Sequence, residues 1–221
     1  MKYLNERQIG FHPSGIGFPN LGDCMALAVH DTGGLFGFHL TRGDLKNAGL
    51  FVKWVKDHLN YQGHMVGLYT ACYYSRRYSQ SATTADWKVE LTSIADALVY
   101  KGEVSGFNLA KSGIGGNEPI YAAINLAGGG CTITYKRMSK MTPTAGPGSA
   151  TDDDIRELAP DPAARKALFE AGRGAEWDVH NPIRKVDTKL GRGDTAHMAI
   201  KTTRSNKGLL HTAKDLDQFT V

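Results

Sequence analysis

The segment Asn20–Thr41, NLGDCMALAVHDTGGLFGFHLT, decides the fold because it holds two apolar runs on either side of a glycine turn. CMALAVHD and LFGFHLT have the small, apolar composition of strands, and DTGG between them suits a tight turn. We therefore predict an antiparallel hairpin. Since the start of its first strand faces the end of its second, Cys24 and His39 should lie close together although fifteen residues separate them.

Helix and strand patterns alternate after the hairpin. Apolar residues recur every three or four positions in residues 45–59, with Asp44 before and Gly63 after them, which predicts an amphipathic helix. HMVGLYTACYY, residues 64–74, predicts a buried strand, and WKVELTSIADALVYKG, residues 87–102, a second helix. The inward face of this second helix should hold Val89, Leu91, Ile94, Leu98 and Val99.

The remaining strand patterns complete a single core. EVSGFNLA, residues 103–110, predicts a strand, and PIYAAINLAGGGCTITYKRM, residues 119–138, predicts a hairpin around its three glycines. The element order ββαβαβββ indicates an α+β fold, in which helices pack on a layered sheet of mixed or antiparallel strands.

A change in composition predicts a domain boundary. MTPTAGPGSA, residues 141–150, is rich in Pro, Gly, Ser and Thr, as linkers are. It should separate a core at 1–140 from a C-terminal extension at 151–221, in which TDDDIRELAP and DPAARKALFEAGRG predict short helices and the rest is irregular.

Composition excludes several classes of protein. The 26 basic and 22 acidic residues leave a charge of +4, too mild a bias to define a nucleic-acid-binding protein. No apolar run reaches the roughly 20 residues that span a bilayer, and MKYLNERQIGFHPSG lacks the apolar region of an export signal. The three cysteines form no CxxC pair and no zinc-like spacing with histidine, which predicts reduced thiols and no metal.

Cys24 and His39 have the chemistry of a catalytic pair. A nearby histidine can take the proton of a thiol, and main-chain N–H groups around Gly22, Asp23 and Cys24 can bind an oxyanion. We expect the Cys24 thiol to be more acidic than those of Cys72 and Cys131. Buried cysteines and lone histidines are also common as ordinary core residues, so composition and spacing leave both interpretations open.

LGDCMALAVHD followed by GLFGFHLT resembles the signature of the chemoreceptor glutamine deamidase CheD family, in which LGxC leads into an apolar strand and a GG…H…L pattern carries the histidine. The fifteen-residue gap is similar to the Cys–His spacing in the catalytic domain of cytotoxic necrotizing factor toxins, which share that fold and deamidate a glutamine of Rho-family GTPases. The resemblance covers residues 15–138, where the order of elements is similar too, and it implies a deamidase-like core.

The resemblance implies a role for each matching residue. Cys24 would be the nucleophile and His39 the general acid and base. CheD proteins orient the histidine with a threonine six residues before the cysteine, where this chain has Phe18. The toxins use a main-chain carbonyl instead, so we expect a carbonyl of Phe18 or Pro19, or the Asn20 side chain, to orient His39.

The implied partner is a protein with an accessible glutamine, and the reaction requires no metal or cofactor. We expect neither a membrane nor a nucleic acid as partner. YYSRRYSQ, residues 73–80, should form an exposed loop beside the site, where Tyr73 and Tyr74, with Thr41, contact the substrate. The extension favours a bacterial toxin or effector over a housekeeping enzyme: a protein made in the bacterial cytoplasm and delivered to a host cell without a classical signal peptide.

Two alternatives stay open at this point. A cysteine protease or a transglutaminase would use the same dyad, because both begin with thiolate attack on an amide. A non-catalytic basic module would instead bind nucleic acid through RKVDTKLGRGD, residues 184–194.

Overall fold

The hairpin forms as predicted and lies at the centre of a seven-stranded sheet. The computed structural model describes residues 2–4, 6–43, 45–79, 81, 83–114, 120–137, 184–186 and 210–221. Strands β4 (Met25–Asp31) and β5 (Gly34–Leu40) pair antiparallel, from Met25 opposite Leu40 to Asp31 opposite Gly34. The sheet order is β10-β2-β5-β4-β6-β7-β12, and its other members are β2 (Gln8–His12), β6 (Met65–Cys72), β7 (Glu103–Asn108), β10 (Arg184–Val186) and β12 (Asp217–Thr220).

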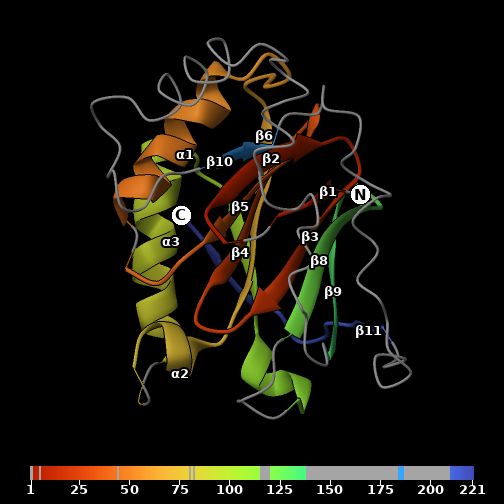
Figure 1. Ribbon diagram of the computed structural model, residues 1–221. Helices are drawn as coiled ribbons and strands as arrows, with labels where there is room; N and C mark the ends of the chain where they lie inside the picture. The colour runs from red at the N-terminus through yellow and green to blue at the C-terminus, as the bar shows by residue number, and fades with distance from the viewer. Residues whose placement is uncertain are drawn as a thin grey trace, which may run out of the picture.

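A second, five-stranded sheet faces the first (Figure 1). Its order is β1-β3-β8-β9-β11, with β1 (Lys2–Tyr3), β3 (Gly15–Leu21), β8 (Ile120–Ala127), β9 (Gly130–Arg137) and β11 (His211–Thr212). The predicted β8–β9 hairpin is confirmed, since Ala127 pairs with Gly130 across a glycine turn. Strands β1, β2 and β3 were not predicted.

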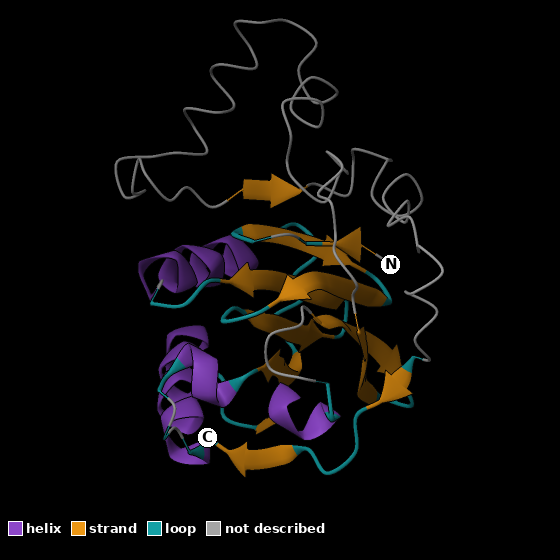
Figure 2. Cartoon of the chain, turned by 60° about the horizontal axis from the view of Figure 1, so that its bottom comes forward, coloured by secondary structure: helices purple, strands orange, loops and turns teal. Residues whose placement is uncertain are grey.

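Helices cover the other face of the seven-stranded sheet (Figures 1 and 2). They are α1 (Leu45–Asp57), the short α2 (Tyr74–Arg77) and α3 (Thr84–Leu98). The 3-10 helix η1 (Leu109–Ser112) lies apart from them, and its Leu109 packs in the core between the sheets. The molecule therefore has two apolar cores, one between the sheets and one between the larger sheet and the helices. Along β4, Met25 and Leu27 face the helices, whereas Ala26 and Ala28 face the other sheet.

The general prediction of an α+β fold is confirmed, and so is the element order: β4, β5, α1, β6, α3, β7, β8 and β9 follow one another as ββαβαβββ, with α2 inserted. One part was wrong: strands form two sheets rather than one layer. In α3 the buried residues are Trp87, Leu91, Ile94, Ala95 and Leu98. Val89 and Val99, expected inside, are 73% and 76% exposed.

The C-terminal residues differ from expectation where they are described. The linker at 141–150 and the two short helices expected after it lie outside the described residues. Residues 210–221, placed by the prediction in an irregular extension, instead add a strand to each sheet: β11 pairs with β9, and β12 pairs with β7. Within the ranges that the structure describes, no helix is both long and apolar enough to cross a membrane.

Candidate active site

Two crossovers between the sheets meet at the end of the central hairpin. The chain passes from the five-stranded to the seven-stranded sheet between β1 and β2, and again between β3 and β4. Cys24 is the last residue of the second crossover, directly before β4. The first crossover contacts His39, because the main-chain N–H of Arg7 donates to the His39 carbonyl at 2.9 Å.

An irregularity in β3 directs the chain toward Cys24. The pairing of β3 with β8 shifts register between Phe18 and Leu21, and Asn20 within this interval has a left-handed backbone with φ of 60°. Asn is among the few non-glycine residues that tolerate this conformation. Gly22 is not among the glycines with positive φ, so the left-handed residue of this segment is Asn20. Gly22 and Asp23 then form a surface turn, after which Cys24 enters the core.

Cys24 and His39 lie on one face of the sheet, as the hairpin predicted. Ala26 pairs directly with His39, and Cys24 precedes Ala26 by two residues, so Cys24 is the diagonal neighbour of His39. Such neighbours are about 7–8 Å apart at Cα, within reach of a long side chain. Both side chains face the five-stranded sheet: Cys24 belongs to the core between the sheets, and the His39 ring meets the Phe18 ring edge-on, with centroids 6.1 Å apart.

A main-chain carbonyl orients the imidazole. Nδ1 of His39 lies 2.8 Å from the carbonyl oxygen of Leu4. Because a carbonyl oxygen only accepts, Nδ1 carries the proton and Nε2 is left as the basic nitrogen. Nε2 is buried and has no hydrogen-bond partner in the structure. Burial also lowers the pKa of His39 to about 4, so the ring is neutral at physiological pH.

The expected kind of orienting group is present, but at another residue. We placed the carbonyl at Phe18 or Pro19, or the contact at the Asn20 side chain, and the structure uses Leu4 instead. Leu4 is held in turn by its N–H, which donates to the Gly17 carbonyl at 2.8 Å. Phe18 contributes its ring to the packing around His39. No sequence signal marks Leu4, because every residue type has the same main-chain carbonyl and the side chain of Leu4 takes no part in the contact.

The Cys24 thiol is protonated at rest. It is 2% exposed, and burial, followed by the negative charges of Glu6 and Asp23, raises its pKa to about 12. Burial raises the pKa of Cys72 and Cys131 to about 12 as well. The expected difference in acidity between Cys24 and the other two thiols is therefore absent in this state. The Cys24 thiol and the His39 imidazole are therefore both neutral at physiological pH.

Glu6 is the polar group in contact with the thiol. Its carboxylate accepts a hydrogen bond from Cys24, and it comes from the same crossover as Leu4. Glu6 itself is exposed. The β1–β2 crossover thus supplies both the carbonyl that orients His39 and a carboxylate that keeps the thiol protonated.

Arg76 lies beside the turn that precedes Cys24. A Cβ atom on Gly22 would be 3.7 Å from Nη1 of Arg76, and the Arg76 guanidinium lies 5.1 Å from the centroid of the Tyr73 ring. This places a cation next to the main-chain N–H groups that we expected to bind an oxyanion. This contact was not predicted, because Arg76 belongs to a polar and aromatic stretch that is typical of a surface loop.

The two tyrosines expected to contact the substrate are buried. Tyr73 and Tyr74 are each 2% exposed and lie at the start of α2. The Tyr74 ring stacks on Trp87, and its hydroxyl donates to Asp217 at 2.9 Å. Neither tyrosine offers a surface for a substrate, which corrects that expectation. Thr41, directly after β5, is half-buried.

Two recesses open on the described surface. One, of about 670 Å³, lies between the end of β5, α2 and α3, and is lined by residues that include Arg42, Arg77 and Glu90. The other, of about 500 Å³, is lined by residues of β7, η1, β9 and the C-terminal segment. Neither is lined by Cys24 or His39. Because Cys24 is 2% exposed, an amide reaches its thiol only after a local movement of the surrounding residues.

Comparisons with known proteins do not assign the chain. No protein-family model matches it, and no curated protein matches it. The described residues also contain no group of three or more His, Cys, Asp and Glu side chains that could hold a metal ion.

Proposed function

We propose that this protein is a cysteine-dependent protein-glutamine deamidase in which Cys24 is the nucleophile and His39 the general base and acid. The observation that carries the proposal is the state of His39: a main-chain carbonyl fixes its ring, and the free Nε2 lies on the same sheet face as the thiol. Because Nε2 has no hydrogen-bond partner, it is available to take a proton from the thiol and to return it.

The reaction would be an acyl transfer in two halves. The Cys24 sulfur attacks the γ-carboxamide carbon of a glutamine while its proton passes to Nε2 of His39. Nε2 then gives that proton to the departing ammonia, and a thioester remains. Water attacks the thioester and loses its proton to Nε2, and the thiol leaves with that proton. The products are glutamate and ammonia.

The resting protonation states fit this order of events. With pKa values of about 12 for Cys24 and about 4 for His39, the pair does not exist as an ion pair before substrate binds. Proton transfer then accompanies attack on the amide, and the thiol stays unreactive toward other electrophiles. The main-chain N–H of Cys24, a neighbouring N–H and the Arg76 guanidinium are the groups placed to stabilise the oxyanion.

A protein substrate would open the site by displacing Glu6. Moving this carboxylate away removes both its hydrogen bond to the thiol and its negative charge, and each change lowers the pKa of Cys24. Substrate binding and thiol activation are thereby coupled. From the resemblance to injected toxins we also propose that the substrate is a host protein and that this protein is an effector.

The test is a search for glutamine-to-glutamate conversion in whole-cell lysates. The protein and its Cys24→Ser variant are incubated with bacterial and animal lysates, and peptides are screened for a gain of about one mass unit at glutamine, the change that hydrolysis of a carboxamide produces. We expect a small set of peptides modified by the wild type alone, with release of ammonia. Peptide cleavage or amine incorporation in place of this conversion would identify a protease or a transglutaminase.

The same variant tests the non-catalytic alternative. Binding to DNA or RNA that weakens with salt and is unaffected by Cys24→Ser, in a protein that converts no glutamine, would show a basic binding module.

A further inference from the structure

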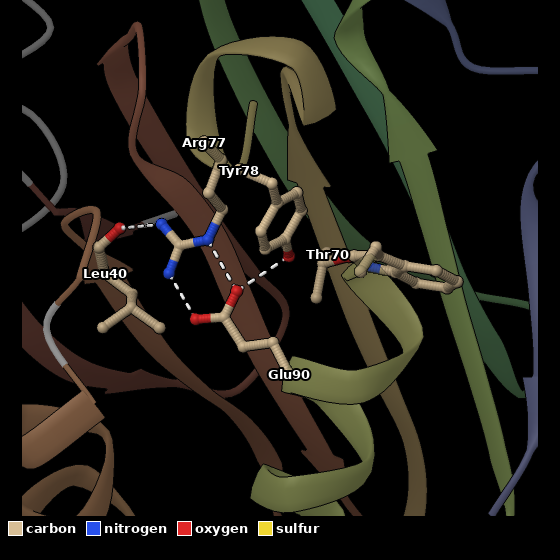
Figure 3. Close-up of polar contacts among 6 residues, drawn as sticks. Leu40, Thr70, Arg77, Tyr78 and Glu90 are labelled. Atoms are coloured by element: carbon tan, nitrogen blue, oxygen red, sulfur yellow. Dashed lines mark hydrogen bonds and ion pairs between the residues drawn. The ribbon is translucent and has the colours of Figure 1, made fainter. Parts of the chain in front are cut away.

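An ion pair beside the dyad is buried and bidentate (Figure 3). Arg77 of α2 is 3% exposed, and the Glu90 side chain of α3 is 11% exposed. Nε of Arg77 donates to Oε2 of Glu90 at 2.7 Å, and Nη2 donates to Oε1 at 2.5 Å. The Tyr78 hydroxyl donates to Oε2 at 2.7 Å. This geometry locks the guanidinium in one orientation.

The remaining arm of Arg77 reaches the strand that carries His39. Nη1 donates to the main-chain carbonyl of Leu40 at 3.2 Å, as Figure 3 shows. Leu40 directly follows His39, and its partner across the sheet is Met25, which directly follows Cys24. Arg77 therefore binds the residue that follows His39, and that residue pairs with the one that follows Cys24.

The ion pair also affects the pKa of the Cys24 thiol. The guanidinium of Arg77 opposes the effect of burial on Cys24, whose pKa it lowers, and it acts on His39 in the same downward direction. Glu90 lies against this guanidinium and balances its charge. A buried ion pair adds little net stability compared with apolar residues of the same size, so stability alone gives no reason for its presence here.

We propose that Arg77 is a positioning residue for the Cys24–His39 pair: through the Leu40 carbonyl it fixes the strand end that carries both side chains, and Glu90 orients the guanidinium and balances its charge. The inference deepens the proposed function and rests on it for its catalytic meaning. Its tests measure thiol alkylation and amide hydrogen exchange rather than glutamine conversion, so the two can fail separately.

The charge is tested by Glu90→Gln, which keeps the size of the side chain and removes its charge. The probe is iodoacetamide, and the rate of alkylation of each cysteine is followed at pH 7–10 by peptide mass spectrometry. We expect Cys24 to react faster by on the order of threefold to tenfold at pH 8, because an unbalanced guanidinium favours the thiolate. Cys131 should be unchanged and Cys72 unreactive.

The matched control is Asp96→Asn on the same helix, which removes an exposed ion pair with Lys101 and should leave all three rates unchanged. The double variant Arg77→Met/Glu90→Gln decides between charge and loosened packing. The acceleration must disappear when Arg77 is also removed. If it persists, or if Glu90→Gln speeds all three thiols together, the ion pair has only a structural role and the proposal is overturned.

The positioning contact is tested by Arg77→Lys, which keeps the charge and loses the planar fork. Main-chain amides of the paired strand ends around Met25 and Leu40 should exchange hydrogen faster by on the order of tenfold, while exchange at the Asp31–Gly34 end of the same hairpin stays at the wild-type rate. The rate of Cys24 alkylation at pH 8 should stay at the wild-type value. Exchange around Met25 and Leu40 that stays at the wild-type rate, or that accelerates equally at both ends of the hairpin, would overturn the positioning role.

Discussion

Nδ1 of His39 lies 2.8 Å from the carbonyl oxygen of Leu4, a residue 35 positions earlier in the chain. This contact fixes the tautomer of the ring and leaves Nε2 as a buried basic nitrogen, on a residue that shares its sheet face with Cys24. The orienting atom belongs to the backbone of a crossover between the sheets. The fold itself, rather than a third catalytic side chain, prepares the histidine.

His39→Gln should abolish glutamine conversion without unfolding the protein. Glutamine has a similar volume and can still donate to the Leu4 carbonyl, but it cannot accept and return a proton. We expect a loss of activity of about 10²- to 10⁴-fold, the usual contribution of a general base. The rate of conversion of modified lysate peptides measures this loss, and circular dichroism checks the fold.

His30→Gln is the matched control for this substitution. His30 is also a buried histidine of the same hairpin, with an Nδ1 atom that has no hydrogen-bond partner, but it lies at the far end of β4 near Tyr69. Its replacement should leave activity within about threefold of the wild type. Equal losses in the two variants would show that a buried imidazole matters for packing rather than for catalysis.

Acid should destabilise the wild type more than His39→Gln. The pKa of His39 is about 4 in the folded state and about 6.5 when unfolded, so between these values only the unfolded chain binds the proton. The free energy of unfolding therefore falls as pH drops below 6.5, and this contribution levels off below pH 4. Urea unfolding at pH 7 and pH 4 should show an extra loss of about 3 kcal/mol in the wild type. Parallel losses in both proteins would contradict a buried neutral imidazole.

Glu6→Gln should make the Cys24 thiol more reactive. The carboxylate raises the pKa of Cys24 through its charge and its hydrogen bond, and glutamine removes the charge. Alkylation of Cys24 by iodoacetamide at pH 8 should become severalfold faster, with Cys131 as internal reference. Asp57→Asn removes an exposed carboxylate of α1 that pairs with Lys53 and should have no effect. An unchanged Cys24 rate in Glu6→Gln would remove Glu6 from the proposed activation step.

The local sequence pattern predicted the central hairpin and the long helices. It also predicted that Cys24 and His39 lie at the same end of the hairpin. These features depend on neighbouring residues: two apolar runs joined by a turn, and apolar positions at helical spacing. The five-stranded sheet was not predicted, because Gly15, Gly17 and Pro19 interrupt the strand pattern of β3. The docking of β12 against β7 depends on pairs such as Phe219 with Val104, which no local pattern contains.

The remaining parts of the site depend on contacts that are distant in sequence. Leu4 acts through its backbone, so its side chain carries no signal. Arg77 and Tyr74 lie in a polar and aromatic stretch that resembles a loop, but their partners Glu90, Leu40 and Asp217 bury them. The acidity of Cys24 was predicted from its neighbours in the chain, whereas its burial and the Glu6 carboxylate determine its pKa.

The central claim is that Cys24 attacks a glutamine carboxamide with the help of His39. Its most direct test is labelling by the glutamine analogue 6-diazo-5-oxo-L-norleucine, which places an electrophilic carbon near the position of the reacting amide, followed by peptide mass spectrometry of all three cysteines. We predict an adduct on Cys24 in the wild type and in His30→Gln, and none in His39→Gln. Labelling of Cys24 that is equally fast without His39, or labelling confined to Cys131, would contradict the account.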